Sequence, residues 1–241
     1  MTRIDTYFTV PEVDASALAD TTVVVIDVVR ATTTIIEALA NGARAIYPTE
    51  STEEAVRLAS SLGREDTLLC GERKGRKVEG FDLGNSPLEF SRDVVEGKKL
   101  VMSTTNGTRA LGVAEEGGRV LVCSFTNLSA VAAAVQGDDH VVLLCAGRED
   151  SFSLDDALCA GHLILRLLDG RGEEPALNDA SRAARALGSA REVSSALLAK
   201  SAGGEAVVEI GLGADLDVCA DLDRHAVVAE MRDKAITRAG A

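Results

Sequence analysis

Asp27 and Arg30 stand three positions apart at the end of an apolar run, and three consecutive threonines, Thr32 to Thr34, follow them. A carboxylate can hold a metal ion, a guanidinium can bind an anion through two parallel hydrogen bonds, and hydroxyl groups can donate further bonds. We therefore interpret this stretch as part of a site for a phosphorylated or otherwise anionic small molecule, together with a metal ion.

The elements that must position these residues are a strand and a helix. Val23 to Ile26 is a run of β-branched residues, which predicts a buried strand, and Ile35 to Leu39 has apolar residues at helical spacing. In open α/β sheets, ligands bind where a strand hands over to a helix, and the helix N-terminus there favours an anion. We expect Asp27 and Arg30 at such a junction.

Three later segments resemble this one in composition and also follow apolar runs: Ser103 to Thr108, Ser124 to Asn127, and Gly147 to Glu149. In a parallel sheet the ends of such strands share one edge. There they would bring hydroxyl and amide groups, Arg30 and Arg148 together, a donor set that suits a phosphate or a sulfonate. Ser, Thr and Asn also cap ordinary helices, so any one of these loops alone would be weak support.

The order of predicted elements indicates an α/β fold. Strands at 3–10, 22–26, 43–47 and 67–70 alternate with helices at 35–39 and 51–62, and alternation resumes from Lys99 to a helix over Leu154 to Leu168. After a linker-like segment the chain reads as mainly helical, with a short strand at Asp215 to Cys219. We expect a single domain over residues 1–241, or two lobes, a sheet core over 1–168 and a mainly helical C-terminal part over 169–241.

Composition excludes several classes of protein. The 241 residues carry a formal net charge of -13, which disfavours binding to nucleic acid or to an anionic membrane. No apolar run reaches the roughly 18 residues that a membrane-spanning helix needs, and the first residues contain no apolar signal region. We therefore expect a cytoplasmic protein with reduced cysteines.

A long segment from Gly71 to Pro87 contains four glycines and four basic residues, and it is either a functional loop or a solvated insertion. Cys70 to Arg76 fits the Cys-x5-Arg pattern of a thiolate phosphatase, although Lys77 stands where such loops have a hydroxyl residue. That pattern has only two fixed positions, so we treat the thiolate mechanism as a minor alternative.

Some residues of the site also have purely structural interpretations. Asp27 can be a capping residue, and Arg30 can pair with Glu37 or Asp27. The neighbouring acids Asp155 and Asp156 are most simply explained as complements to the dipole of a first helical turn. The three histidines are scattered along the chain, and we interpret all of them as structural.

Several blocks of the sequence, in this order, resemble the 2-phosphosulfolactate phosphatase family (ComB type). The blocks are Ile26 to Thr34, Gly71 to Gly75, Gly80 to Pro87, Thr104 to Thr108, Ser124 to Asn127 and Cys145 to Arg148. The resemblance runs from about Thr22 to Gly161, and Ser201 to Cys219 matches more loosely.

This resemblance implies a three-layer α/β/α, ComB-like fold with a largely parallel sheet. It also implies a Mg²⁺-dependent hydrolase, a phosphatase that converts (2R)-phospho-3-sulfolactate to 3-sulfolactate and phosphate in coenzyme M biosynthesis. The ligand would then be a small anionic phosphorylated molecule. The sequence does not decide whether the protein is a monomer or a homo-oligomer.

The residues that match the family's blocks become candidates for the site. The resemblance implies catalytic roles for Asp27, Glu72 and Asp82, of which Asp27 and Glu72 would hold Mg²⁺. Substrate and phosphate binding would fall to Arg30, Thr32, Arg73, Asn85, Thr104, Thr105, Asn106, Gly107, Thr108, Asn127 and Arg148. Two other functions stay open: a non-catalytic sensor of a phosphorylated hydroxy acid, and a phosphatase of a different phosphorylated hydroxy acid.

Overall fold

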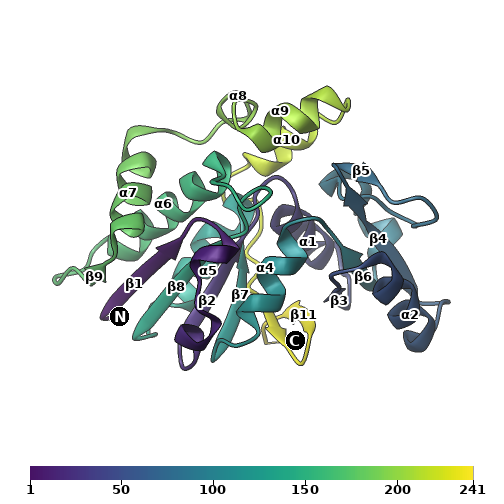
Figure 1. Cartoon of the computed structure of the whole chain (residues 1–241), viewed down its shortest axis with the longest axis horizontal. Coiled ribbons are helices and arrows are strands. Elements are labelled where there is room, and N and C mark those ends of the chain that lie inside the picture. Colours follow the sequence, from purple (N-terminus) through teal and green to yellow (C-terminus); the bar gives the residue numbers. More distant parts are fainter. Residues whose placement is uncertain (241) are drawn as a thin grey trace.

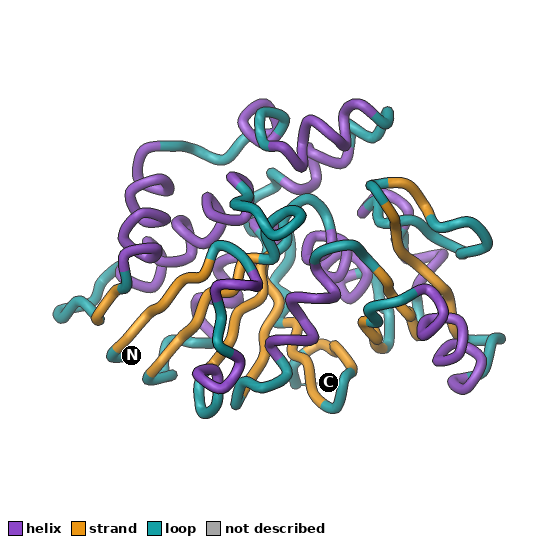
Figure 2. The backbone as a smooth tube through the Cα atoms, in the orientation of Figure 1, coloured by secondary structure: helices purple, strands orange, loops and turns teal. Residues whose placement is uncertain are grey.

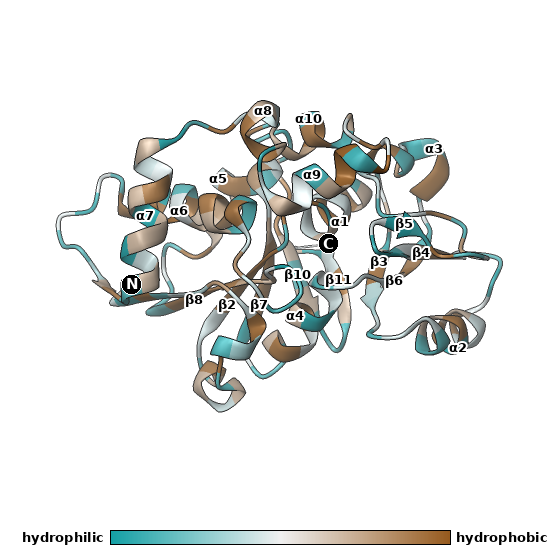
Figure 3. Cartoon of the chain, turned by 45° about the horizontal axis from the view of Figure 1, so that its top comes forward, coloured by the Kyte–Doolittle hydropathy of each residue, from teal (hydrophilic) through white to brown (hydrophobic). Residues whose placement is uncertain are grey.

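Aliphatic strands buried on both faces form the centre of the protein. In the computed structural model, which describes residues 1–240, Val23 to Ile26 are entirely inaccessible to solvent. A strand that reads as continuously apolar is expected in a sheet covered by helices on both sides. The colouring by hydropathy shows these central strands among the most hydrophobic parts of the chain (Figure 3).

The strands are β1 (Arg3–Tyr7), β2 (Thr22–Ile26), β3 (Ala45–Pro48), β4 (Thr67–Arg73), β5 (Arg76–Lys77), β6 (Lys99–Ser103), β7 (Arg119–Cys123), β8 (His140–Cys145), β9 (Ala176–Leu177), β10 (Ala229–Arg232) and β11 (Ala235–Arg238). The α-helices are α1 (Ala31–Ala40), α2 (Thr52–Leu62), α3 (Arg92–Val95), α4 (Gly107–Ala114), α5 (Leu128–Ala134), α6 (Leu154–Leu168), α7 (Asp179–Ala190), α8 (Ser195–Leu198), α9 (Ala202–Glu209) and α10 (Asp215–Cys219). Short 3₁₀ helices lie at Val10–Glu12, Ala15–Leu18, Pro87–Glu89 and Phe125–Asn127.

The sheet runs in the order β5-β4-β6-β3-β11-β10-β7-β2-β8-β1-β9 (Figure 1). Strand β2 pairs in parallel with β7 and β8, so Val24 lies opposite both Leu121 and Leu143. Strands β3, β4 and β6 form a second parallel block. The hairpin of β10 and β11 joins the two blocks, antiparallel to β7 on one side and to β3 on the other. The last strands of the chain therefore sit in the middle of the sheet.

Helices cover both faces of this sheet, which gives three layers (Figure 2). Helices α1 and α4 pack on one face through residues such as Ile35 and Leu111. Helices α5 and α6 pack on the other face through residues such as Leu128 and Leu163. The expected α/β/α architecture with a largely parallel sheet is confirmed. Within residues 1–240 no helix combines the length and the apolar character that crossing a membrane requires.

Several local predictions are confirmed and others are wrong. The alternating strands and helices of the first third are present, and α6 matches its predicted bounds at both ends. The predicted strand at Asp215 to Cys219 is instead helix α10. The segment from Gly71 to Pro87 is not one long loop, because β4 extends to Arg73 and turns back as β5. The division at residue 168 stays a prediction, although the hairpin of β10 and β11 belongs to the sheet.

Helices α6 and α7 approach each other closely because glycines face each other at their contact. A Cβ atom added to Gly161 would lie 2.0 Å from the carbonyl oxygen of Ala184. One added to Gly188 would lie 2.7 Å from the carbonyl carbon of Gly161. Backbone atoms cannot yield as the end of a flexible side chain can, so only glycine allows this separation of the helices.

We therefore expect Gly161→Ala to lower the free energy of unfolding by about 2–3 kcal/mol or more, the cost of overpacking a rigid contact. Gly172→Ala is the matched control, since nothing lies within 4 Å of its added Cβ. Urea unfolding of both variants measures the difference. Equal stabilities would show that α6 and α7 can move apart without cost.

Candidate active site

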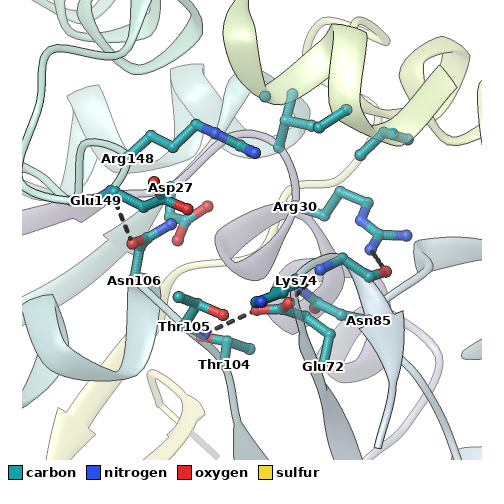
Figure 4. A pocket seen from close by; sticks show the side chains of 15 residues that line it. Asp27, Arg30, Glu72, Lys74, Asn85, Thr104, Thr105, Asn106, Arg148 and Glu149 are labelled. Atoms are coloured by element: carbon teal, nitrogen blue, oxygen red, sulfur yellow. Dashed lines mark hydrogen bonds between the residues drawn. The ribbon is translucent and has the colours of Figure 1, made fainter. Parts of the chain in front are cut away.

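A cavity opens at the carboxyl edge of the sheet, between that edge and helix α9. It contains about 550 Å³ of empty space, including the part open to solvent. Its lining consists of Asp27, Val29, Arg30, Glu72, Lys74, Gly75, Asn85, Thr104, Thr105, Asn106, Arg148, Glu149, Gly203, Ala206 and Val207. Figure 4 shows the polar side chains of this cavity, which come from segments far apart in the sequence.

The loop between β6 and α4 reaches the cavity from a distant strand. Four strands separate β6 from β2 in the sheet, yet α4 begins beside the end of β2. A Cβ atom on Gly107 would lie 2.6 Å from the Cβ of Ala31 and 2.7 Å from Oδ2 of Asp27. The absence of a side chain at Gly107 therefore lets the start of α4 approach Asp27 and carries Thr104 to Asn106 to the cavity.

Asp27 is a buried carboxyl group with one oxygen held by the backbone. Its Oδ1 accepts a hydrogen bond from the amide of Ala31 at 3.3 Å, and 7% of the residue is exposed. Burial, followed by the negative charge of Asp155, raises the pKa of Asp27 to about 7, and the charge of Glu72 adds to this. A carboxyl group with a pKa near neutrality in a cavity is typical of a functional site.

Asp155 and Asp156, at the start of α6, lie against Asp27 in a small recess of the same cavity. Asp156 accepts hydrogen bonds from the amides of Val28 at 2.8 Å and Gly147 at 3.1 Å, and thereby joins the loops that follow β2 and β8. Burial raises the pKa of Asp156 well above its usual range, and the charges of Asp155 and Asp27 raise it further. The sequence interpretation of this pair as ordinary residues of a first helical turn missed their position beside Asp27. Two adjacent acidic residues in a sequence do not indicate which other residues surround them in the fold.

Glu72 connects two loops around the cavity. Its Oε1 accepts a hydrogen bond from the amide of Thr105 at 2.7 Å, and its Oε2 accepts one from the amide of Gly75 at 2.6 Å. The carboxylate therefore fixes the turn between β4 and β5 against the loop between β6 and α4, while it also lines the cavity. Similarly, Asn106 accepts a hydrogen bond at its Oδ1 from the amide of Glu149 at 3.3 Å, which holds a third loop.

Arg30 is an internal cross-link more than a free anion-binding group. Its Nη1 donates to Asp215 on α10 at 2.7 Å, and its Nη2 donates to the carbonyl oxygen of Gly75 at 2.6 Å. Both side chains of the ion pair are almost fully buried, and the second oxygen of Asp215 accepts from Ser86 at 2.6 Å. The expected partners Glu37 and Asp27 are not the ones that Arg30 binds, and Glu37 pairs with Arg224 and His225.

Arg148 and Lys74 are the cations of the cavity that remain available to a ligand. Neither side chain makes a hydrogen bond or ion pair with another of residues 1–240, and the guanidinium of Arg148 extends into the open centre of the cavity (Figure 4). Arg148 was expected from the sequence. Lys74 was not, although it lies in a basic segment of an acidic chain and within the family-like block from Gly71 to Gly75.

Other sequence candidates lie outside the lining of the cavity. Thr32 is fully buried, and its hydroxyl donates to the carbonyl oxygen of Asp27 at 2.8 Å. Thr108 bonds with Thr104 across the first turn of α4. Arg73 donates to the carbonyl oxygens of Glu72 and Ser103. Each of these side chains therefore supports a loop.

Asn127 and Asp82 are further removed from the cavity lining. Asn127 forms a capping box with Ser124, and its Nδ2 donates to the carbonyl oxygens of Val122 and Val227, so it anchors the C-terminal chain. Asp82 accepts from the amide of Leu69 at 2.7 Å. The structure thus does not bring Asp82, expected as a catalytic carboxylate, to the cavity with Asp27 and Glu72.

The thiolate alternative finds no support at Cys70. This thiol is fully buried and donates to the carbonyl oxygen of Val101. Burial raises its pKa far above the usual range, and the charges of Asp82 and Glu89 raise it further. A nucleophilic cysteine needs a lowered pKa and access to the substrate, and Cys70 has neither.

The carboxylates of the cavity fit a magnesium ion of the kind that binds together with a phosphorylated ligand. Within residues 1–240 no group of three His, Cys, Asp or Glu side chains has the spacing of a complete metal site. Mg²⁺ usually takes one or two carboxylates and fills its other positions with water and substrate phosphate. Asp27 and Glu72 both line the cavity, and their mutual repulsion, with that from Asp155, favours a cation there.

Comparison with known proteins identifies the family. Residues 7–234 match the family model described as 2-phosphosulpholactate phosphatase. The chain is 37% identical to a protein of Clostridium perfringens (strain SM101 / Type A) over 97% of this chain and 95% of that protein. It is 38% identical to one of Clostridium beijerinckii over 98% and 99%, and 39% identical to one of Pseudothermotoga lettingae over 85% and 87%. All three are named "Probable 2-phosphosulfolactate phosphatase". The chain belongs to this family, as its sequence blocks indicated.

The raised pKa of Asp27 predicts a dependence of stability on pH. The ordinary pKa of this group is 3.8 and its pKa in the folded protein is about 7. Between these two pH values the folded state holds a proton that the unfolded state releases, so the free energy of unfolding falls as pH rises through this range. The substitution Asp27→Asn removes the loss of stability that comes from ionising this buried carboxyl group. In EDTA we expect the variant to melt at least ~2–4 °C above the wild type at pH 8, and the gap to close near pH 4.

Differential scanning fluorimetry at several pH values measures this difference between the two proteins. Asp155 and Asp156 titrate in both proteins, but removing the charge of Asp27 also lowers the pKa of Asp156, so the measured gap includes this coupling. A gap that stays constant from pH 4 to pH 8 would show that Asp27 has an ordinary pKa.

The two hydrogen bonds of Glu72 predict a separate effect. In Glu72→Gln an NH₂ group must face one backbone N–H, so we expect a loss of about 1–3 kcal/mol in stability and a looser turn between β4 and β5. Limited trypsin digestion after Lys74, Arg76 and Lys77 should then become faster. Glu79→Gln is the control, because Glu79 is exposed and makes no side-chain hydrogen bond with residues 1–240. Unchanged digestion of Glu72→Gln would show that the carboxylate does not hold this turn.

Proposed function

We propose that this protein is a Mg²⁺-dependent phosphatase that hydrolyses (2R)-phospho-3-sulfolactate to 3-sulfolactate and phosphate. Its family makes it a phosphoric monoester hydrolase with a small phosphorylated substrate. One observation carries the finer proposal: a single cavity places the carboxylates Asp27 and Glu72 near two cations, Lys74 and Arg148, that have no partner among residues 1–240. Such a set can accept both a metal ion and a ligand with several negative charges.

Phosphoryl transfer depends mainly on positioning and on neutralising charge, and the residues of the cavity suit both tasks. The guanidinium of Arg148 binds the phosphoryl oxygens through two parallel hydrogen bonds, which fixes the orientation of the group. Asp27 and Glu72 would hold Mg²⁺, which when bound there neutralises charge on the phosphate. Glu72 keeps the two loops of the cavity in register while it does so.

Helix α9 limits the access of water. Gly203, Ala206 and Val207 line the cavity on the side opposite the sheet, and none of them offers a polar side chain. In a cavity that is partly shielded from solvent, each charge interaction with the substrate is stronger than it would be in open water.

We further propose that the reaction takes place in the cytoplasm, as the composition of the sequence led us to expect, and that it contributes to coenzyme M biosynthesis, as the family resemblance implies. The substrate is the part of this proposal that fold and site constrain least, because one fold can serve several phosphorylated hydroxy acids. A panel of substrates therefore belongs in the test.

We expect the purified protein to release phosphate from 2-phosphosulfolactate with Mg²⁺ and to lose that activity in EDTA. Asp27→Asn should lower kcat at least ~100-fold, because it removes both a negative charge and a metal ligand. Asp82→Asn is the matched control and should stay within about twofold of the wild type, since Asp82 lies outside the cavity lining.

The outcomes separate the alternatives. Release in EDTA at the full rate would reject the metal. Preferred release from another phosphorylated hydroxy acid would change the substrate. Tight binding of 2-phosphosulfolactate without turnover, measured by calorimetry, would make the protein a sensor and not an enzyme. A large loss of kcat in Asp82→Asn would show that Asp82 takes part in catalysis.

A further inference from the structure

The cavity has fewer free cations than its basic residues suggest. Arg30 is neutralised by Asp215 in a buried ion pair, and Arg73 is occupied by carbonyl oxygens and by the hydroxyl of Ser103. Of the residues that line the cavity, only Arg148 and Lys74 offer a positive charge without an internal partner among residues 1–240. Among the side chains of the cavity, recognition of several negative charges therefore falls to these two.

The two cations belong to different ends of the cavity. Arg148 shares a small recess with Asp27, Asn106, Asp155 and Asp156. Lys74 lies in the turn between β4 and β5, next to Gly75, and Gly75 and Asn85 also line a second hollow that contains Arg76 and Lys77. Figure 4 shows Arg148 on the side of Asp27, and Lys74 on the side of Glu72 and Asn85. One end thus combines a cation with Asp27, Asp155 and Asp156. The other combines a cation with an amide and with Glu72, whose two oxygens already accept from backbone amides.

Asn85 is a second unused group at the end that contains Lys74. The residue is 5% exposed, and its side-chain Oδ1 is buried without a hydrogen-bond partner. Its backbone is fixed, because its carbonyl oxygen accepts a bond from Thr34 at 3.0 Å. A buried amide with no partner within residues 1–240 costs free energy unless a ligand completes its bonds. The Oδ1 atom is an acceptor and cannot itself bind an anion. The amide's Nδ2, which also makes no hydrogen bond with residues 1–240, is the donor that can complete an anion site beside Lys74.

The backbone of the turn does not itself require a lysine at position 74. Lys74 has a φ of 52°, a left-handed conformation for which Gly or Asn is better suited. The side chain also contributes no hydrogen bond or ion pair to the fold of residues 1–240. Lys74 is exposed and lines the cavity, so its ammonium group is accessible to a ligand there.

We propose that Lys74, with Asn85, forms a specificity subsite for the sulfonate of the substrate, while Arg148 binds the phosphoryl group beside Asp27. This inference rests on the proposed function, because that substrate carries a sulfonate remote from the scissile bond. The chemistry of the side chains supports the division. A planar guanidinium matches a phosphate bidentately, whereas an ammonium on a flexible stem is a point charge that suits a sulfonate of any orientation. Lys74 is thus a residue for substrate selection, whereas Asp27 at the other end lies beside the phosphoryl group.

The test compares two substrates that differ only in the sulfonate: 2-phospho-3-sulfolactate and 2-phospholactate. Lys74→Met keeps the length of the side chain and removes its charge. We expect it to raise KM for the sulfonated substrate by about 10- to 100-fold, the loss of one charged hydrogen bond, with kcat nearly unchanged. KM and kcat for 2-phospholactate should stay the same, and Lys74→Arg should restore part of the preference.

Lys77→Met is the matched control, since Lys77 lies on the same hairpin but outside the lining of this cavity. Equal losses on both substrates would place Lys74 on a group that they share, the phosphate or the carboxylate, and would overturn the sulfonate subsite. So would an unchanged KM in Lys74→Met.

The wild type reports separately on the proposed function. If it hydrolyses the sulfonated substrate and Lys74→Met behaves like the wild type, only the subsite is wrong. If the wild type releases phosphate from neither substrate, the proposed function fails, and the sulfonate subsite is rejected with it. Calorimetric titration of 3-sulfolactate into wild type and Lys74→Met gives a readout without turnover: weaker binding in the variant supports the subsite, and equal binding overturns it.

Discussion

The buried ion pair between Arg30 and Asp215 is the contact on which the cavity depends. It joins the residue that begins α1 to a helix almost two hundred positions later, and it also fixes the carbonyl oxygen of Gly75 and the hydroxyl of Ser86. Removing one partner of such a pair leaves an uncompensated buried charge, which typically costs about 3–5 kcal/mol. The guanidinium of Arg30 therefore couples the edge of the sheet to the turn between β4 and β5 and to the C-terminal helices.

This coupling decides which charges are left for a ligand. Because Arg30 is used inside the protein, a substrate meets Arg148 and Lys74 instead. The acidic net charge of the chain does not oppose this, since solvent and salt screen exposed charges beyond about 10 Å, whereas the charges in the cavity act at short range. A small polyanion can thus be bound by a protein whose overall charge is -13.

Opposite these cations, the protein keeps several carboxyl groups close together at a cost. Burial raises the pKa values of Asp27, Asp155 and Asp156, and repulsion from neighbouring carboxylates raises those of Asp27 and Asp156 further. Backbone amides offset part of that cost, most directly where Asp156 accepts from Val28 and Gly147. The same two bonds set the positions of the loops that carry Asp27 and Arg148. The same cluster of carboxyl groups thus has two effects: its negative charge favours a cation, and its hydrogen bonds order the loops.

The sequence by itself determined the parts of this protein that depend on neighbours along the chain. Its β-branched run predicted β2, its alternating elements predicted the α/β sheet, and its ordered blocks identified the family. It also selected Asp27, Glu72, Asn85, Thr104, Thr105, Asn106 and Arg148, which the structure brings to one cavity. Strand ends of a parallel sheet meet at one edge, so local patterns were sufficient for this much.

Only the tertiary structure decided what each polar group contacts. Arg30 and Arg148 look equivalent in the sequence, yet Arg30 is paired with Asp215 and Arg148 has no side-chain partner within the described part of the chain, residues 1–240. Asp155 and Asp156 looked like an ordinary first turn, and the central hairpin of β10 and β11 had no local signal strong enough to predict it. The physical reason is that hydrogen-bond partners and burial depend on residues far apart in the chain. These residues come together only in the complete sheet, in which the last two strands occupy central positions.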